Sequence, residues 1–177
     1  MNVTTTDLPG VLIIEPKVFL DARGFFLETY NREKYVTAGL NVDFVQDNLS
    51  FSSKGVLRGL HYQKPHAQGK LVYVLQGEVW DVAVDIRRDS PFFGKWAAVT
   101  LSSDNKKQFY IPPGFAHGFC VMSETALFTY KCTDMYHPEF DAGVRWDDPD
   151  IGIPWPVAAP ILSEKDKKQP WLQEIPK

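Results

Sequence analysis

The clearest structural signal in the chain is the stretch Leu71-Val-Tyr-Val-Leu-Gln-Gly-Glu-Val-Trp-Asp-Val-Ala-Val-Asp-Ile86. Gln76-Gly77 divides it into two apolar arms, and in the second arm large apolar residues alternate with Asp81, Ala83 and Asp85. An alternation with period two is typical of a strand in a sheet with one face buried. The stretch therefore predicts two β-strands joined by a turn.

Further strand-like segments lie on both sides of this stretch, and clusters of turn-forming residues separate them. They cover residues 11–20 and 25–30, which form a predicted hairpin around Asp21-Ala-Arg-Gly24, and residues 42–48, 56–63, 93–101, 107–111, 118–122 and 126–133. Residues 50–55 are polar and predict a turn, and Asn31 is predicted to cap a short helix over residues 32–38 that Gly39 ends. About nine strands with closely spaced turns indicate an all-β sandwich or barrel.

The composition is that of an ordinary soluble protein with room for one sizeable core. The chain has 177 residues, of which 44% are apolar and 23% charged, so we expect a single domain over residues 1–177. The net charge of −3 argues against a dedicated nucleic-acid surface, and no apolar run approaches the roughly 20 residues of a membrane span. Residues 1–10 lack a signal-peptide pattern, and Cys120 and Cys132 are expected to be buried and reduced, so the sequence predicts a cytoplasmic protein.

The pattern changes from residue 144 onward, where prolines and tryptophans replace the regular alternation. Val144-Arg-Trp-Asp-Asp-Pro149 and Ile151-Gly-Ile-Pro-Trp-Pro156 contain prolines, which remove hydrogen-bond donors from a strand ladder. We therefore expect residues 144–177 to form an extended arm, anchored on the sheet by its aromatic and aliphatic side chains. Ser163 precedes a predicted helical stretch over residues 164–168, in which Asp166 occupies a position like that of a capping box.

Three segments place polar side chains where the interior of a sheet is normally apolar. They are Leu57-Arg-Gly-Leu-His-Tyr-Gln63, Pro112-Pro-Gly-Phe-Ala-His-Gly118 and Leu127-Phe-Thr-Tyr-Lys-Cys132. A single His or Tyr in a strand is usually a hydrogen-bonded core or rim residue, but three such segments at strands or at a barrel mouth strengthen the case for a site. Alternation places Tyr130 on the inward side of its strand. Strict alternation puts Arg58 and His61 on opposite faces, and a bulge at Gly59 would reconcile them.

The predicted architecture resembles the cupins, which are small jelly-roll barrels with an open mouth. The spacings Gly55-x5-His61 and Pro112-x-Gly114-x2-His117 are similar to the two cupin motifs. Where metal-binding cupins supply further ligands, this chain has Gln63 and Lys70. Only His61 and His117 remain as good ligands, whereas catalytic zinc usually takes three protein ligands. The resemblance therefore implies a cupin-type jelly-roll barrel with short peripheral helices that has lost its metal site.

Longer motifs resemble, in the right order, those of the dTDP-4-dehydrorhamnose 3,5-epimerase family. They are Asp21-Ala-Arg-Gly-Phe-Phe26, Gln46-Asp-Asn48, Arg58-Gly-Leu-His-Tyr-Gln63, Pro113-Gly-Phe-Ala-His-Gly-Phe119, Tyr130-Lys-Cys-Thr133, Trp146-Asp-Asp-Pro-x-Ile-Gly-Ile-x-Trp-Pro156 and Leu162-Ser-Glu-Lys-Asp166. The resemblance covers essentially the whole chain. It implies an isomerase that inverts C3 and C5 of dTDP-4-dehydro-6-deoxy-D-glucose, beside the 4-keto group, to give dTDP-4-dehydro-L-rhamnose in dTDP-L-rhamnose biosynthesis.

Such a reaction needs a base on one face of the sugar, an acid on the other, and a donor at the developing enolate oxygen. The resemblance implies that His61 is the base and that Asp166 orients and stabilises it. It also implies that Tyr130 is the acid and that Lys70 stabilises the enolate. No cofactor is implied, because the ketone itself is the electron sink.

The resemblance further implies a set of substrate contacts and a second subunit. Tyr136 matches an aromatic residue that stacks on the thymine base, and the other matched positions are Arg23, Glu28, Gln46, Asn48, Arg58, His117, Glu139 and Lys165. His66 and His137 match no such position. In the family the first strands cross to a second subunit, so we expect a homodimer with swapped N-terminal strands, in which the hairpin over residues 11–30 carries Arg23 and Glu28 to the partner's site.

Three other functions stay open at this point. A close alternative is a relative that inverts only one carbon, or that acts on another dTDP-4-keto sugar. A metal-dependent cupin enzyme is disfavoured by Gln63 and Lys70. A carbohydrate-binding barrel without activity would leave the set of His61, Lys70, Tyr130 and Asp166 without a task.

Overall fold

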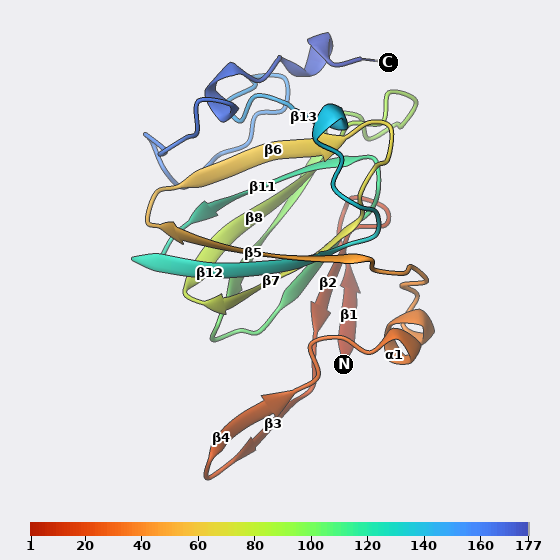
Figure 1. Cartoon of the computed structure of the whole chain (residues 1–177), viewed down its shortest axis with the longest axis vertical. Helices are drawn as coiled ribbons and strands as arrows, with labels where there is room; N and C mark the ends of the chain where they lie inside the picture. Colours follow the sequence, from red (N-terminus) through yellow and green to blue (C-terminus); the bar gives the residue numbers. More distant parts are fainter. Residues whose placement is uncertain (177) are drawn as a thin grey trace.

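The computed structural model describes residues 1–176 and consists mainly of two antiparallel sheets that face each other (Figure 1). In the six-stranded sheet the order is β1 (Asn2–Thr5), β2 (Leu12–Glu15), β10 (Gln108–Ile111), β7 (Lys70–Gln76), β12 (Thr125–Cys132) and β5 (Gln46–Ser53). In the five-stranded sheet it is β13 (Asp141–Gly143), β6 (Leu57–Gln63), β11 (Phe115–Val121), β8 (Glu78–Asp85) and β9 (Trp96–Ser102). β3 (Val18–Asp21) and β4 (Gly24–Leu27) form a separate hairpin, and the all-β prediction is confirmed.

The stretch with the clearest sequence signal connects the two sheets. Its first arm is β7, which pairs with β10 and β12, and its second arm is β8, which pairs with β9 and β11. The chain passes from one sheet to the other at Gly77, whose φ of +83° suits glycine. A Cβ atom at this position would collide with the carbonyl oxygen of Thr125. The predicted turn is therefore a corner of the barrel.

The main hydrophobic core fills the space between the two sheets. It combines Val72 and Val74 of β7 and Phe128 of β12 with Phe115 and Phe119 of β11, all of them buried. The rings of Phe119 and Phe128 stack across the interior with their centroids 4.1 Å apart. Contacts between residues of opposite sheets thus hold the barrel closed.

The outer face of β8 is also buried, which corrects the expectation of one buried face. Val82 and Val84 pack beneath the C-terminal arm, against Ile151, Leu172 and Ile175. The alternate residues, Asp81, Ala83 and Asp85, are buried as well. Alternation marks two faces of different chemistry here, and the sequence pattern could not show that a distant segment covers the outer one.

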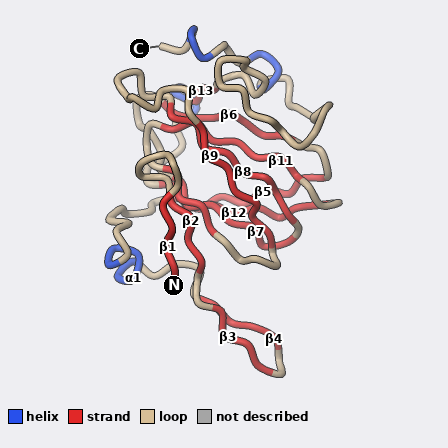
Figure 2. The backbone as a smooth tube through the Cα atoms, turned by 180° about the vertical axis from the view of Figure 1, so that it is seen from behind, coloured by secondary structure: helices blue, strands red, loops and turns tan. Residues whose placement is uncertain are grey.

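The predicted arm over residues 144–177 is confirmed as far as residue 176, and its last residue lies outside the described part. Figures 1 and 2 show this segment lying across the end of the molecule next to β6 and β13. The indole Nε1 of Trp155 donates to the carbonyl of Trp146 at 2.7 Å, and the ring packs edge-on against Trp80 of β8. The arm also carries two short 3-10 helices, η2 (Asp166–Lys168) and η3 (Leu172–Glu174), where the sequence predicted one helical stretch.

The N-terminal region differs from the single predicted hairpin. Residues 11–20 do not form one strand, because β2 ends at Glu15 and pairs with β1 and β10 inside the six-stranded sheet. Pro16 interrupts the run and removes a donor. The turn at Asp21–Gly24 is confirmed, and the hairpin β3–β4 projects away from the barrel (Figure 2).

The sequence-based prediction missed β1 and ended β5 too early, because both contain polar residues with little strand propensity of their own. β1 is polar, and residues 50–55 were predicted as a turn, yet β5 continues to Ser53 and pairs with β12 along its whole length, from Gln46–Cys132 to Ser53–Thr125. Backbone pairing with a distant strand overrides the weak local propensity of serine.

The helical elements are few and peripheral. The helix predicted over residues 32–38 is confirmed as α1 (Arg32–Thr37), where the side chain of Asn31 accepts from the backbone N–H of Lys34. A 3-10 helix, η1 (Pro138–Phe140), precedes β13. Within residues 1–176, no helix has the length and apolar character needed to cross a lipid bilayer.

A register shift in β6 confirms the bulge proposed at Gly59. His61 pairs with His117 and Arg58 pairs with Phe119, so two residues of β6 oppose one residue of β11. Gly59 has a φ of +135° and lies against the backbone of Gly118. The shift places Arg58 and His61 where strict alternation would not.

We therefore expect Gly59→Ala to destabilise the protein strongly. The new Cβ would lie 2.5 Å from the Cα of Gly118 and 2.9 Å from the carbonyl oxygen of His117, in addition to the unfavourable φ. We expect a loss of about 3 kcal/mol in the free energy of unfolding, measured by urea denaturation. The matched control is Gly39→Ala, because Gly39 also has a positive φ (+96°) but has no atom near its Cβ position, and it should lose about 1 kcal/mol. Equal losses in the two variants would contradict the role of the close approach.

Candidate active site

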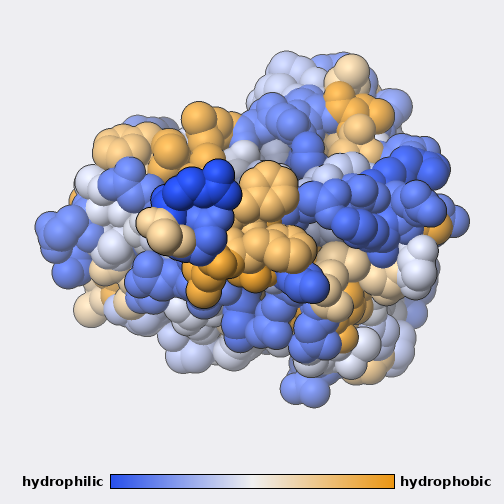
Figure 3. Space-filling view, turned by 90° about the horizontal axis from the view of Figure 1, so that it is seen from below, coloured by the Kyte–Doolittle hydropathy of each residue, from blue (hydrophilic) through white to orange (hydrophobic). Residues whose placement is uncertain are grey.

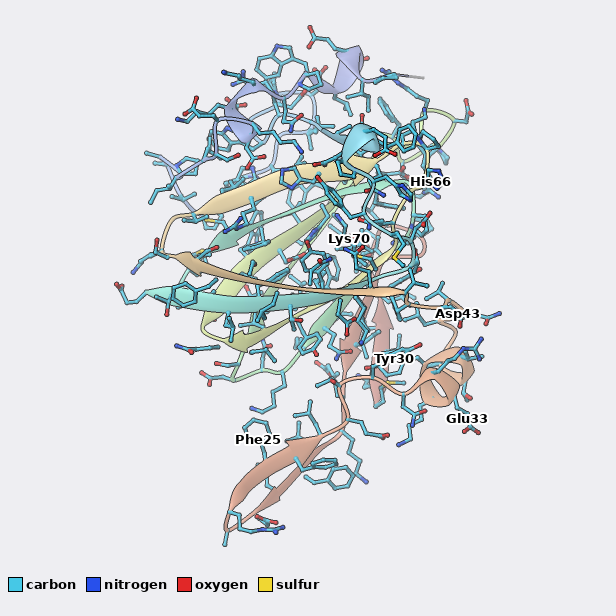
Figure 4. The ribbon with its side chains drawn as sticks, viewed as in Figure 1. Phe25, Tyr30, Glu33, Asp43, His66 and Lys70 are labelled. Carbon is cyan, nitrogen blue, oxygen red and sulfur yellow. The ribbon has the colours of Figure 1, made fainter. Side chains whose placement is uncertain are left out.

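The interior of the barrel becomes polar toward the end where β7 begins and β12 ends. In the six-stranded sheet Lys70 pairs with Cys132, and Tyr130 pairs with Asn48. In the five-stranded sheet His61 pairs with His117. Figure 4 shows Lys70 in the space between the two sheets. Strand register therefore gathers the three polar segments singled out in the sequence at one end of the barrel.

His61 and Asp166 form a hydrogen-bonded pair between β6 and the C-terminal arm. The His61 Nε2 and an Asp166 carboxylate oxygen lie 2.5 Å apart, and the Asp166 side chain is only 4% exposed. Burial is the largest single effect and raises the pKa of the Asp166 carboxyl, but the hydrogen bond to His61, the charge of His61, the hydrogen bond from Ser163 and the charge of Lys165 together outweigh it, so the pKa lies below its ordinary value. The ionised carboxylate holds the imidazole in one orientation.

Ser163 holds Asp166 in place. Its hydroxyl accepts the backbone N–H of Asp166 at 3.1 Å, as expected for a residue that precedes a helical turn. The side chain of Asp166 does not return to the backbone in a capping box but points at His61. The local turn at Ser163 agrees with the sequence-based prediction. The carboxylate of Asp166, however, binds His61 and does not cap the turn.

A second pair, His117 and Asp81, lies deeper in the barrel than the sequence suggested. The Nε2 of His117 is 2.9 and 3.1 Å from the two carboxylate oxygens of Asp81, and both side chains are buried. Burial lowers the pKa of His117 and raises that of Asp81, and the attraction between the two groups opposes both changes. His117 was expected at the barrel mouth; instead its ring stacks on Phe128 in the core.

Lys70 stands between these groups. Burial lowers the pKa of its ammonium group, while Cys132, Asp141 and Asp81 act in the opposite direction. Its charge in turn contributes to the low pKa of His117, as does that of His61. Lys70 is partly buried, and the field of a partly buried ammonium group is screened less than that of one in open water.

Tyr130 projects inward from β12, as alternation predicted. Its ring packs beside Phe128, with the ring centroids 6.0 Å apart. Burial is the main cause that raises the pKa of the Tyr130 phenol to about 12. The phenol therefore keeps its proton at neutral pH. Because β12 and β6 belong to opposite sheets, Tyr130 and His61 approach the interior from two sides.

Several predicted substrate contacts meet at the rim of this region. The Tyr136 hydroxyl donates to Asp141 at 2.9 Å, and Lys165 forms an ion pair with the same carboxylate. The side chain of Gln46 accepts the backbone N–H of Tyr136 at 2.8 Å and donates to Asn48 at 3.1 Å. These contacts tie β5, the arm and the loop that carries Tyr136 to one edge of the barrel.

Arg58 reaches the same rim from β6. Its guanidinium donates to the hydroxyl of Ser52 at 3.0 Å, on β5 of the opposite sheet. A cavity of about 270 Å³ lies between β6 and the arm and is lined by Arg58, His61, Lys165 and Asp166, among others. A cationic rim beside a buried acid–base pair suits an anionic ligand.

Three predicted contacts lie apart from this cluster. Arg23 is 90% exposed and pairs with Asp21 at the tip of the β3–β4 hairpin, and Glu28 pairs with Lys34 of α1. Figure 4 shows Phe25 of the same hairpin far from Lys70. Glu139 lies in η1 with its side chain 62% exposed, next to His137. A single chain does not bring Arg23 and Glu28 to the polar end of the barrel.

The donor set at this end does not suit a catalytic metal. His61 and His117 each direct Nε2 at a carboxylate, and the neighbouring cationic side chain of Lys70 repels a cation. Gln63, which occupies the position of a further cupin ligand, uses its amide elsewhere: it donates to the carbonyls of His66 and Met135 and accepts the N–H of His137. The arrangement suits proton transfer to and from a ligand by a histidine on one side and a tyrosine on the other, beside a partly buried ammonium group.

Sequence reasoning missed Asp81 and Asp141 as members of this cluster. Asp81 stands in an apolar strand, and its burial could have been suspected because a buried acid needs a partner. The regular alternation around Asp81 instead predicts that it lies on an exposed face. Asp141 carries no such signal, since its role depends on β13 pairing with β6.

Both free cysteines, Cys120 and Cys132, are buried, as predicted.

Comparison with known proteins agrees with this geometry. The family model of dTDP-4-dehydrorhamnose 3,5-epimerase matches residues 5–174. A protein of that name from Shigella flexneri is 58% identical over 168 residues, which cover 94% of this chain and 93% of the relative. A more distant solved structure, a 3'-monoepimerase from Streptomyces bikiniensis in complex with dTDP-quinovose, is 32% identical, with a TM-score of 0.89 over 95% of this chain and 86% of the other.

A closer solved structure is dTDP-6-deoxy-D-glucose-3,5-epimerase from Legionella pneumophila, in complex with dTDP-4-keto-L-rhamnose. It is 52% identical and superposes with a TM-score of 0.96, covering 99% of this chain and 94% of the other. The cupin-type jelly-roll prediction is thereby confirmed. The extent of the family match and the identity to these relatives show that the chain is an isomerase of the dTDP-4-dehydrorhamnose 3,5-epimerase family.

Proposed function

We propose that this protein inverts C3 and C5 of dTDP-4-dehydro-6-deoxy-D-glucose to give dTDP-4-dehydro-L-rhamnose for dTDP-L-rhamnose biosynthesis. The observation that carries the proposal is the placement of a histidine–carboxylate pair and a protonated tyrosine on opposite sheets, with a partly buried lysine on the strand next to the tyrosine. Each inversion removes a proton next to the ketone and returns one to the other face of the ring. Two proton-transfer groups on opposite sides meet that need.

His61 is the proposed base. Its Nε2 lies against the buried carboxylate of Asp166, which stabilises the imidazolium formed when the ring takes a proton from carbon. The ring is one-third exposed, so substrate can reach it from the cavity between β6 and the arm.

Lys70 stabilises the enolate that proton removal creates. Its ammonium group is partly buried, and there a positive charge lowers the energy of a developing oxyanion more than in open water. The carboxylate of Asp81, which pairs with His117, attracts the ammonium group of Lys70 and acts to raise its pKa. Asp81 and His117 therefore act through Lys70, as positioning residues.

Tyr130 returns the proton on the opposite face. Its phenol stays protonated up to high pH, because burial raises its pKa to about 12. The proton leaves the phenol as the enolate carbon accepts it, and solvent or the rim groups restore it. This chemistry uses no redox cofactor, because the ketone accepts the electron pair of the broken C–H bond.

The rim residues bind the nucleotide part of the substrate in this proposal. Arg58 and Lys165 face the diphosphate, since a guanidinium and an ammonium group bind phosphate oxygens well. Tyr136, whose side chain is half exposed, stacks on the thymine ring. Gln46, Asn48 and Glu139 complete the polar contacts.

The proposed active unit is a homodimer. The hairpin exposes Phe19, Leu20, Phe25 and Phe26, each more than half exposed, and the outer face of β5 exposes Leu49 and Phe51. Figure 3 shows hydrophobic side chains gathered on the face seen from the hairpin end. Exposed apolar patches of this kind mark interfaces. Packing the hairpin on a second copy would bury it and deliver Arg23 and Glu28 to the partner's site.

We further propose that residues 1–177 act as one domain and that the protein works in the cytoplasm. The arm packs on the outer face of β8 and supplies Asp166, so it belongs to the same folding unit as the barrel. Buried, unpaired cysteines suit a reducing compartment.

An epimerase that inverts only one carbon is the second candidate. The Streptomyces bikiniensis 3'-monoepimerase has a similar fold at 32% identity, so the fold alone does not set the number of carbons inverted. Incubation with dTDP-4-keto-6-deoxyglucose in heavy water, with chelator present, separates the two by NMR. Deuterium at both C3 and C5 supports the double inversion, deuterium at one carbon supports the alternative, and no exchange contradicts both.

The same assay tests the division of labour between His61 and Tyr130. We expect His61→Ala to abolish exchange at both carbons, because it removes the proposed base. Tyr130→Phe should keep proton removal but slow the formation of inverted product by about 100-fold. Asp89→Asn, which changes an exposed acid in another loop, is the control and should behave as the wild type. If Tyr130→Phe lost every step equally, the assignment of Tyr130 as the acid would be wrong.

The pH dependence of exchange distinguishes Lys70 from Tyr130. Burial lowers the pKa of Lys70 below 10.5, so its charge is lost at a lower pH than that of a free lysine. The Tyr130 phenol remains protonated to about pH 12. We therefore expect the exchange rate to fall with rising pH as Lys70 loses its proton, at a pH lower than the ordinary lysine pKa of 10.5. Tyr130→Phe should leave the pH of this fall unchanged. A decline that disappears in Tyr130→Phe would contradict the assignment.

Mixing two inactive variants tests whether Arg23 serves the partner. If Arg23 acts across the dimer, a subunit carrying Arg23→Ala and one carrying His61→Ala form heterodimers with one intact site. After unfolding and refolding together in equal amounts, random pairing should restore about one quarter of wild-type activity. If Arg23 acts within its own chain, the mixture will stay as inactive as the separate variants.

A further inference from the structure

His66, Asp134 and His137 form a cluster that the proposed reaction does not use. His66 lies in the loop after β6, while Asp134 and His137 lie in the loop after β12. The His66 Nδ1 is 3.4 Å from one Asp134 carboxylate oxygen, and the His137 Nε2 is 4.0 Å from the other. One potential ligand atom from each residue lies within 4.8 Å of the others. Figure 4 shows His66 at the edge of the molecule, outward from Lys70.

The chemistry of the three side chains suits a divalent transition metal. Two imidazoles and one carboxylate form a ligand set that zinc commonly takes, with bonds of about 2.0–2.2 Å that place tetrahedral ligands about 3.5 Å apart. The ligand atoms lie up to 4.8 Å apart, so the side chains must close by up to about 1.3 Å to reach this spacing. Within residues 1–176, no lysine or arginine pairs with Asp134, so its charge is not already neutralised by a fixed cation.

The backbones that carry the two histidines are fixed by one buried side chain. Gln63 is 5% exposed, and its Nε2 donates to the carbonyls of His66 and Met135 at 2.8 and 3.1 Å. Its Oε1 accepts the N–H of His137 at 2.7 Å. The loops after β6 and β12 are thus joined before any ligand binds, which reduces the entropic cost of assembling a site.

The ring orientations fit the same assignment. The rings of His66 and His137 stack with centroids 4.3 Å apart, and each ring has one nitrogen within 4.0 Å of an Asp134 carboxylate oxygen. Glu139 lies 3.8 Å from the other ring nitrogen of His137, Nδ1. A carboxylate next to the second nitrogen is the usual outer partner of a metal-bound histidine, because it leaves the first nitrogen free to bind.

We propose that His66, Asp134 and His137 form a surface binding site for a divalent transition-metal cation of the zinc type. The cation joins the loop after β6 to the loop that carries Tyr136. Its role is structural, since the site lies outside the group of His61, Lys70 and Tyr130. The ligand is recognised by imidazole and carboxylate donors, which bind zinc-type cations more tightly than magnesium or calcium.

Calorimetric titration of Zn²⁺ into the tag-free, chelator-treated protein tests the site. We expect one Zn²⁺ per chain, with affinity reduced at least tenfold in each of His66→Gln, Asp134→Asn and His137→Gln. Asp89→Asn removes an exposed acid from another loop and should bind as the wild type. His61→Asn should also keep the stoichiometry, which separates this site from the proposed base. Undiminished binding in the first three variants would overturn the proposal.

A second readout does not depend on affinity alone. Co²⁺ bound to two imidazoles and a carboxylate should give visible absorption bands that each of the three variants loses. Zn²⁺ should also raise the melting temperature of the wild type and of Asp89→Asn, but not that of the three variants, whose folding is checked by circular dichroism without metal. A rise of equal size in all proteins would show binding elsewhere and would count against the proposal.

Discussion

The close approach of Gly59 to Gly118 is the constraint on which the site depends. Two strands of the five-stranded sheet meet there without any Cβ atom between them, and a Cβ on Gly59 would lie 2.5 Å from the Cα of Gly118. The extra residue that β6 accommodates at this point shifts its register against β11, so that His61 faces His117. Without the shift, the alternation of side chains would turn either Arg58 or His61 away from the rim.

Ionisable groups at this end of the barrel are held by partners, because an isolated charge in a core is costly. Asp81 is paired with His117, and Asp166 is paired with His61. Lys70 is the exception among them: burial lowers its pKa, and it has neighbouring negative groups without a direct ion pair to Asp81. A partly buried cation without an ion-pair partner provides an electrostatic potential that an oxyanion can use.

The C-terminal arm links stability to the site. It covers Val82 and Val84 on the outer face of β8, and the same segment presents Asp166 to His61, 105 residues away in the chain. The rim depends on it too, since Lys165 meets Asp141 of β13. One extended segment with little regular structure therefore completes both a hydrophobic layer and the proposed acid–base pair. Its tryptophans and aliphatic residues supply the packing energy that prolines deny to a strand ladder.

The sequence by itself determined the all-β class, the turn at Asp21–Gly24, the capped helix α1 and the inward side of Tyr130, because turn chemistry, capping and alternation are local properties of the chain. Motif resemblance added the family and the residues of the proposed site. Only the tertiary structure decided that β7 and β8 belong to different sheets, that residues 50–53 continue a strand, and that Asp81 is buried with His117. Each of these features depends on strand pairing with, or burial by, residues far away in the sequence. Such long-range contacts leave no local pattern in the residues that they pair or bury.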